Sequence, residues 1–473
     1  SMHCLSMDTQ PPFLLWCERT LRKKGAERLT GAICILELMV CSRCVGHQSS
    51  EKMARNPADE RFRGLDFAHS PEMLRMFNNI FGLHEFRVNQ LEAINATILK
   101  ENVFVVGGNG AGKSLCYQLP ACLSAGVTVV ISPLNVLPLY LTLWGDHDYT
   151  DAENIYEQLS ENDPMIKLLY VTPEKLAADW LQLYWSMIES IDLVCLCSWG
   201  DDFRPDYGTL NELQQDFQGV PMIAVSGPIG PHIQEDILKK LQMTNPQVFT
   251  MSFNRTNLKY AVPTRTTMYG EMDCITWIKE HYPRDSGIVY CWRRVVCEYM
   301  ADSLNEAGLL ACSYHAGMPN RDRESAQNKW KENECQVICA TVAFGMGIHK
   351  PDVRYVIHTF LPKSMEQYHR ESGRAGRDGN MSHCILFYSD SDHGVLERDG
   401  ELVKLEPMVE YCLKKKDCRR IQLLTYFGGV DTEANLCKKN TETICDNCER
   451  DNVSKQLCFN LTSSTKPVCR CQY

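Results

Sequence analysis

The sequence predicts an α/β protein that contains two parallel-sheet units in tandem. Short apolar runs rich in β-branched residues alternate with helical stretches, and Gly, Pro, Ser or Asn bounds most of these runs. Continuous apolar strands separated by helices are typical of parallel sheets that are covered on both faces. The first unit takes the runs Val103–Val106, Val127–Ile131, Leu168–Val171, Asp192–Leu196 and Met222–Val225, and the second takes Gly287–Tyr290, Val337–Cys339, Val353–Ile357 and Cys384–Phe387.

Composition restricts the class of protein. The chain has 473 residues, enough for two or three domains, and 44% of them are hydrophobic, which suits a globular protein. The net charge of −10 excludes a molecule that is basic as a whole, so any DNA contact must come from local basic patches. One such run is Lys414–Lys416 with Arg419 and Arg420, although alone it is better explained as a solvated helix face.

The cysteines indicate a reduced, intracellular protein. There are 24 of them, but a disulfide scaffold is not expected in a chain this long without a secretory signal. The apolar stretch Ala32–Cys41 contains Glu37 and is too short to span a bilayer, so no membrane segment is expected. Residues 1–60 show no clear periodicity, and Cys41 with Cys44 forms a lone CxxC that is a weak metal-site signal.

A phosphate-binding loop follows the first predicted strand. Residues 107–114 read GGNGAGKS and fit the pattern G-x-x-x-x-G-K-[ST] in full, between a strand and a helical segment. Glycines such as Gly110 and Gly112 let backbone N–H groups cradle phosphate oxygens. Lys113 reaches the terminal phosphates, and the Ser114 hydroxyl ligates magnesium. The sequence therefore predicts ATP and Mg²⁺ as cofactors.

Further motifs, in this order and at this spacing, resemble the RecQ family of DNA helicases from about residue 63 to residue 450. They are Phe81-Gly82, Phe86-Arg87 and Gln90, followed by KSLCYQLP at 113–120, LLYVTPE at 168–174, WGDDFR at 199–204, YHAG at 314–317, ATVAFGMG at 340–347 and ESGRAGRDG at 371–379. The resemblance implies a divergent segment at 1–62 and two RecA-like domains at 63–262 and 263–398. It also implies a helical zinc-binding subdomain at 399–450 and a loose tail at 451–473.

The resemblance assigns nucleotide-binding roles. Arg87 and Gln90 would hold the adenine, and Asp192 would serve the magnesium ion. Arg374 and Arg377 would reach the γ-phosphate, a task that suits arginine because its charge is permanent and its fork matches phosphate oxygens.

The same resemblance implies a DNA track. Trp199, Arg204, His315 and Thr341 would contact a single strand, and an aromatic ring such as Trp199 can stack on a base without reading sequence. Single-stranded DNA and a duplex with a 3′ tail are therefore the expected partners, and the nucleus is the expected location.

Departures from the family pattern fall on the hydrolysis and coupling motifs. Leu193 stands where the family carries the water-polarising glutamate, and one residue is missing nearby. If the strand register is right, Leu193→Glu is expected to restore turnover in part. The Thr-Ala-Thr motif reads VSGPI at Val225–Ile229. Pro138 falls in a shortened helical segment, Arg370 replaces a glutamine, and the stretch after Tyr388 is short. These departures predict slow hydrolysis and leave phosphate binding intact.

Four cysteines near the end of the chain form a candidate zinc site. They are Cys418, Cys437, Cys445 and Cys448, of which the last two form a C-x-x-C pair. Four thiolates satisfy a tetrahedral structural zinc, and the alternative is four free cysteines in a cysteine-rich chain. The flanking segments Cys418–Leu424 and Tyr426–Gly428 match the RecQ zinc subdomain.

Three functions remain in competition. The first is an ATP-dependent 3′–5′ DNA helicase, which the motif spacing favours. The second is an ATP-gated DNA-binding module without turnover, and the third is a drifted copy or a faulty gene model, both of which Leu193 favours. Because only 25 residues follow Cys448, no strand-separating winged helix is expected.

Overall fold

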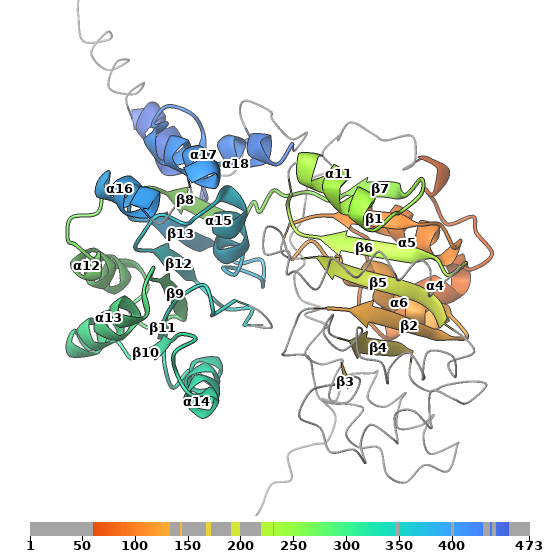
Figure 1. Ribbon diagram of the computed structural model, residues 1–473, viewed down its shortest axis with the longest axis horizontal. Helices are drawn as coiled ribbons and strands as arrows, with labels where there is room; N and C mark the ends of the chain where they lie inside the picture. The colour runs from red at the N-terminus through yellow and green to blue at the C-terminus, as the bar shows by residue number, and fades with distance from the viewer. Residues whose placement is uncertain are drawn as a thin grey trace, which may run out of the picture. The chain divides into compact units, whose positions relative to one another are not determined.

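The computed structural model describes residues 60–108, 110–132, 142–143, 167–171, 191–198, 219–229, 231–345, 350–398, 402–428, 436–437 and 441–453. The predictions for Cys41, Cys44, Trp199 and Arg204 concern residues outside these ranges. The described chain forms two compact units, which are separated between Phe253 and Asn254 and are each built around one parallel sheet (Figure 1). None of the helices in these ranges has the length and apolar character that a membrane crossing requires.

The first unit contains a seven-stranded sheet in the order β3-β4-β2-β5-β6-β1-β7, with every pair parallel. Its central strands β1, β2 and β6 are fully buried, and helix α5 contacts β1 and β7 while α6 contacts β2 and β5. The elements are α4 (Ser70–Asn79), α5 (Gln90–Ile98), β1 (Val103–Val106), α6 (Leu115–Leu123), β2 (Val127–Ile131), β3 (Thr142–Leu143), β4 (Leu168–Val171), β5 (Ile191–Ser198), β6 (Met222–Ser226), α11 (Pro231–Lys240) and β7 (Gln247–Thr250).

The second unit contains a six-stranded parallel sheet in the order β10-β11-β9-β12-β13-β8. Helix α13 contacts β10 and β11, and α15 contacts β12 as well as α17 and α18. The elements are β8 (Leu258–Ala261), α12 (Glu271–His281), β9 (Gly287–Tyr290), α13 (Arg294–Glu306), β10 (Ala311–Tyr314), α14 (Asn320–Lys331), β11 (Val337–Ala340), β12 (Tyr355–His358), α15 (Met365–Ser372), β13 (Ser382–Leu386), α16 (Ser391–Arg398), α17 (Leu402–Leu413) and α18 (Arg419–Tyr426).

The prediction of two parallel-sheet units is confirmed, and all nine predicted runs are strands whose ends lie within two residues of the predicted ends. Four strands were not predicted, namely β3, β7, β8 and β10. Each of the four is an edge strand of its sheet. Because β8 pairs with β13, the compact unit around the second sheet includes the residues from Asn254 onward, and the domain boundary between residues 262 and 263 stays a prediction.

Candidate nucleotide, DNA and zinc sites

The phosphate loop lies at the carboxyl edge of the first sheet, where β1 ends and α6 begins. The N–H of Gly107 donates to the Ser226 carbonyl at 3.2 Å, and the Met251 N–H donates to the Val106 carbonyl at 2.7 Å. These bonds fix the start of the loop between the ends of β6 and β7. The Lys113 ammonium donates to the carbonyls of Gly107 and Gly108, both at 2.8 Å, so its charge lies over the loop that would cradle the phosphates.

The residues predicted to hold the adenine contact the phosphate loop. Gln90 is buried at the start of α5, and its side-chain oxygen accepts a hydrogen bond from the Arg87 N–H at 3.0 Å. The amide nitrogen of Gln90 donates to the Gly112 carbonyl at 3.0 Å, and the Arg87 guanidinium donates to the Gly110 carbonyl. Gly112 has φ +84°, and a Cβ on it would lie 2.5 Å from the Gln90 amide nitrogen, so this close approach requires glycine.

The register of β5 places Asp192 far from the phosphate loop. Ser198, the last residue of β5, pairs with Ser226, which in turn pairs with Val106 directly before the loop. Asp192 lies six residues before Ser198, about 20 Å along the strand at roughly 3.3 Å per residue. It also falls at an irregularity, because Val127 pairs with Ile191 and the next residue of β2 pairs with Leu193. The magnesium role of Asp192 stays a prediction that this register does not support.

Leu193 lies in the hydrophobic core of the first unit. Its side chain is only 4% exposed and belongs to the same buried cluster as Val105, Val130 and Ile223. A glutamate at this position would therefore sit among apolar side chains rather than facing a water molecule beside ATP. The expectation that Leu193→Glu restores turnover stays a prediction, and this buried position does not support it.

Ser226 is a residue of the carboxyl edge that the sequence did not single out by itself. It ends β6 within the altered Val225–Ile229 segment, and it is fully buried. Its hydroxyl has no hydrogen-bond partner among the described residues, although its carbonyl accepts from the loop. The alignment of this segment with a coupling motif was the signal that pointed to it.

His315 and Thr341 lie side by side at the carboxyl edge of the second sheet. They directly follow the neighbouring strands β10 and β11, and the Thr341 N–H donates to the Tyr314 carbonyl at 3.3 Å. The His315 ring is buried, and its Nε2 atom lies 3.1 Å from a carboxylate oxygen of Glu298 on α13. The second unit thus brings together the two predicted DNA contacts that it carries.

Arg374 follows α15, which begins at a well-formed cap. The Ser364 hydroxyl accepts a hydrogen bond from the Gln367 N–H at 3.2 Å, as expected for an N-cap serine. Arg374 is buried beside Gly345, where a Cβ would lie 2.9 Å from its Nη2 atom. Burial raises the pKa of the Tyr290 hydroxyl well above its ordinary value, and the positive charge of Arg374 opposes this rise.

The loop that carries Arg374 and Arg377 is held by a residue that the sequence did not reveal. The Arg255 guanidinium donates to the carbonyls of Gly373, Ala375 and Gly376 at 3.2, 2.9 and 2.7 Å. Three carbonyls bound to one rigid fork fix the course of the loop. Arg255 precedes β8 in the sequence, and nothing in its local pattern indicates this contact.

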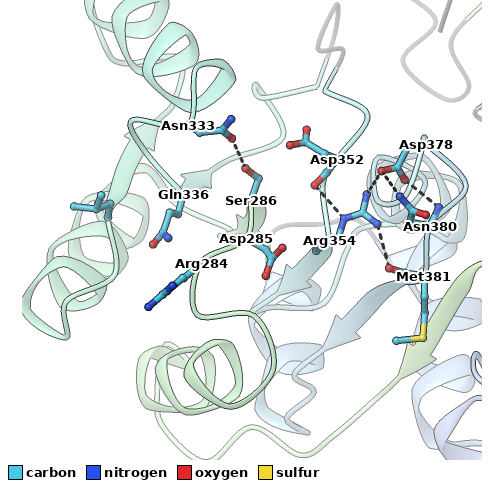
Figure 2. Close-up of a pocket in the computed structure, with 11 residues that line it drawn as sticks. Arg284, Asp285, Ser286, Asn333, Gln336, Asp352, Arg354, Asp378, Asn380 and Met381 are labelled. Atoms are coloured by element: carbon cyan, nitrogen blue, oxygen red, sulfur yellow. Dashed lines mark hydrogen bonds and ion pairs between the residues drawn. The ribbon is translucent and has the colours of Figure 1, made fainter. Parts of the chain in front are cut away.

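A pocket of about 620 Å³ lies at the amino edge of the second sheet (Figure 2). Its lining includes Arg284, Asp285, Arg354 and Asp378, and Arg354 donates to a carboxylate oxygen of Asp378 at 2.5 Å. The positive charge of Arg354 is thus neutralised by the carboxylate of Asp378. The pocket also lies at the opposite end of the strands from His315, so it is separate from the predicted DNA track.

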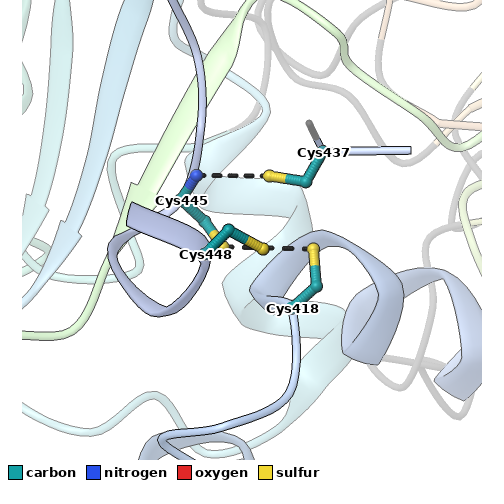
Figure 3. Close-up of side chains that lie close together, drawn as sticks. All are labelled: Cys418, Cys437, Cys445 and Cys448. Carbon is teal, nitrogen blue, oxygen red and sulfur yellow. Dashed lines mark hydrogen bonds between the residues drawn. The ribbon is translucent and has the colours of Figure 1, made fainter. Parts of the chain in front are cut away.

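The four predicted zinc ligands converge on one point (Figure 3). The sulfur atoms of Cys418, Cys437, Cys445 and Cys448 all lie within 4.8 Å of one another, and those of Cys418 and Cys445 are 3.9 Å apart. Zinc–sulfur bonds of about 2.3 Å in a tetrahedron separate the sulfurs by roughly 3.8 Å, so the cluster fits zinc. The Cys445 N–H donates to the Cys437 sulfur at 3.2 Å, and burial raises the pKa of the Cys448 thiol to about 12.

Two buried arginines directly after Cys418 anchor this cluster. The Arg419 guanidinium donates to the Asp446 carboxylate at 3.0 and 3.3 Å, and this carboxylate also accepts a hydrogen bond from the N–H of Val262, directly after β8. Arg420 donates to the Asn254 side chain at 3.0 Å and to the Arg255 carbonyl at 2.5 Å. The zinc cluster is thereby connected to the residue that holds the Arg374 loop.

Three family descriptions match the chain. They are DEAD/DEAH box helicase over residues 87–214, Helicase conserved C-terminal domain over 271–379 and RecQ zinc-binding over 385–449. The chain is 50% identical over 433 residues to the RecQ-like DNA helicase BLM of Xenopus laevis, covering 83% of this chain and 32% of that protein. It is 39% identical over 426 residues to a Caenorhabditis briggsae relative of the helicase Q1 type, covering 84% and 68%.

Solved structures share the fold. The Mycobacterium smegmatis helicase Lhr bound to single-stranded DNA and AMP-PNP matches with a TM-score of 0.55 at 18% identity, covering 76% of this chain and 50% of that one. The helicase MrfA bound to DNA matches with a TM-score of 0.54 at 14% identity, covering 78% and 60%. The chain spans about a third of the length of the Xenopus relative.

We predict that Leu193→Glu destabilises the first unit. The change removes a buried apolar side chain and places a carboxylate in the core, which should lower the free energy of unfolding by about 3 kcal/mol or more. Urea unfolding followed by circular dichroism measures this loss. The matched control is Leu99→Glu, at a leucine that is 45% exposed, which should change little. Equal stability of both variants, with ATP turnover raised only by Leu193→Glu, would contradict this prediction and support a role for a glutamate at this position.

We predict that the purified chain carries about one zinc ion held by the four cysteines. Because structural zinc contributes folding free energy, Cys418→Ser should lower both the zinc content and the melting temperature. Elemental analysis and thermal unfolding measure the two effects. Cys312→Ser is the control, since Cys312 is partly exposed and lies outside the cluster. A metal-free wild type, purified without chelator, would contradict the prediction.

Proposed function

The chain belongs to the RecQ family of ATP-dependent DNA helicases, and we propose that it binds Mg-ATP and single-stranded DNA but hydrolyses ATP slowly. The observation that carries this proposal is the difference between two positions on the first sheet, the phosphate loop and Leu193. In the described part of the phosphate loop, Lys113 donates hydrogen bonds to the carbonyls of Gly107 and Gly108, whereas Leu193 is buried in the core.

Nucleotide binding would use groups that already lie together. Lys113 and Ser114 would meet the phosphates and the magnesium ion, and Gly110 and Gly112 give the loop its shape with positive φ angles. Gln90 and Arg87 would meet the adenine beside the loop. We assign Arg374 and Arg377 to the γ-phosphate, in keeping with the buried position of Arg374 and the tight support of its loop.

Slow hydrolysis would follow from the leucine at position 193, where the family carries a glutamate. Among the described residues that end or directly follow the strands of the first sheet, none is a carboxylate, and the register puts Asp192 near the opposite edge. A positioned general base typically contributes about 10² to 10⁴-fold to a rate. The chain would therefore act as an ATP-gated DNA-binding protein of a helicase family, and we propose that it does so in the nucleus.

DNA binding would be independent of this defect. His315 and Thr341 lie on the second unit, and their positions follow from strands β10 and β11 alone. Trp199 and Arg204 would add contacts from the first unit. Such contacts are electrostatic and stacking in nature, so they do not require ATP turnover.

We predict that Lys113→Ala weakens nucleotide binding by about tenfold or more, because it removes a charged donor to the phosphates. Titration with a fluorescent ATP analogue and magnesium measures the change. Lys239→Ala is the control, at a lysine whose side chain is 76% exposed on α11. Equal affinity in all three proteins would contradict ATP binding by the loop. If the wild type hydrolyses ATP at the rate of an active helicase and Lys113→Ala abolishes this turnover, slow hydrolysis would be contradicted and ATP binding would stand.

We predict that a duplex with a 3′ single-stranded tail is bound but scarcely unwound. Binding should weaken steeply as salt rises, because it depends on phosphate contacts. A gel assay with and without ATP separates bound duplex from released strand. ATP-dependent release that Lys113→Ala abolishes would favour an active helicase, and the lack of any gel shift at low salt would favour a drifted copy.

A further inference from the structure

An aromatic and cationic stack lies at the carboxyl edge of the second sheet, between strand ends. Trp292 follows β9, and its indole stacks on the Phe360 ring, with centroids 4.8 Å apart and planes 14° from parallel. The Arg293 guanidinium carbon lies 3.7 Å from the centroid of the same indole. One cation and two rings therefore form a continuous column.

The base of the column is rigid. Phe360 is buried, and the Arg265 guanidinium carbon lies 5.7 Å from its ring centroid. Arg265 makes a bidentate pair with Asp392, at 2.6 and 3.0 Å, and the Asp392 side chain is fully buried. A paired cation under Phe360 limits the movement of the rings above it.

The outer end of the column is accessible. Trp292 is half-buried, whereas Arg293 and Arg294 are both exposed. Arg293 precedes α13, and its guanidinium lies close enough to the indole to stack on it. A planar guanidinium held in this way can stack on a nucleobase and attract the neighbouring phosphate.

The column is continuous with the predicted DNA track. In the sheet, β9 lies between β11 and β12, so Trp292 lies between the strand end that carries Thr341 and the one that carries Phe360. The Arg294 side chain lies beside Gly317 and near His315. A Cβ on Gly317 would be 3.1 Å from the Nη1 atom of Arg294 and 3.3 Å from the Nδ1 atom of His315. That Nδ1 atom is buried and has no hydrogen-bond partner among the described residues.

We propose that Arg293, positioned by Trp292, is a base-stacking site for single-stranded DNA on the second unit. Arg293 contacts the base, and Trp292 is a positioning residue that holds the guanidinium plane. The proposal rests on the proposed single-strand binding and adds a site beyond His315 and Thr341. The site is independent of sequence, because every base has a π-face.

The test uses the full chain and two fluorescent oligonucleotides, a dT strand and a strand of the same length with abasic units in place of bases. Anisotropy titrations at several salt concentrations give the affinity and its salt slope. Arg293→Ala should weaken binding to the dT strand by about fivefold or more and reduce the salt slope by about one. Arg293→Lys keeps the charge and loses the plane, so it should weaken binding to the dT strand only and keep the slope.

Trp292 supplies the second arm. Trp292→Ala should weaken binding to the dT strand and leave the abasic strand unaffected, whereas Trp292→Phe keeps a ring and should restore most of the affinity. Arg284→Ala is the matched control, because Arg284 is an exposed arginine before the opposite end of the same strand (Figure 2). Thermal unfolding of each variant verifies that the fold is intact.

The outcomes separate the two claims. If Arg293→Lys and Trp292→Ala both bind the dT strand as tightly as the wild type, the stacking site is overturned and the proposed function stands. Equal losses on the dT and abasic strands would show a phosphate contact and would also overturn it. A wild type that binds neither strand at low salt would overturn the proposed function, and the stacking site with it.

Discussion

The shared direction of the strands is the constraint on which the candidate sites depend. In a parallel sheet all carboxyl ends meet at one edge, so residues far apart in the sequence become neighbours when each follows a strand. The phosphate loop follows β1, His315 follows β10, Thr341 follows β11 and Trp292 follows β9. The same rule separates Asp192 from the nucleotide site, because it lies at the other end of β5.

Guanidinium groups of three arginines connect the parts of the second unit. Arg419 and Arg420 follow a zinc ligand, and both use their donors within the fold, one on Asp446 and the other on the segment before β8. Arg255 in that segment holds three carbonyls of the Arg374 loop. Arg419 and Arg420 are buried, and a buried guanidinium without hydrogen-bond partners would destabilise the fold, so their bonds stabilise this part of the unit. Zinc binding and the position of the Arg374 loop therefore share one network.

Much of this architecture was predictable from the sequence, and the limits have physical causes. Central strands such as β1 and β2 read as continuous apolar runs because both faces are buried. Edge strands such as β8 and β10 are exposed on one side and have mixed patterns, LKYA and ACSY, so they gave no clear signal. The cysteine cluster was predictable from its spacing, whereas Arg255 acts across 118 to 121 residues of sequence and left no local pattern.

The position of Leu193 shows why a motif position cannot be read from neighbouring letters alone. Side chains alternate between the faces of a strand, so an irregularity of one residue changes which face each side chain occupies. β5 has such an irregularity at Asp192, and the following Leu193 enters the core. In the sequence, Asp192-Leu193 thus resembles an altered hydrolysis motif. The strand register, however, puts the two residues at the amino end of β5. The nucleotide and DNA sites proposed for this chain are built from the ends of other strands, so a change at this position of β5 would leave them in place.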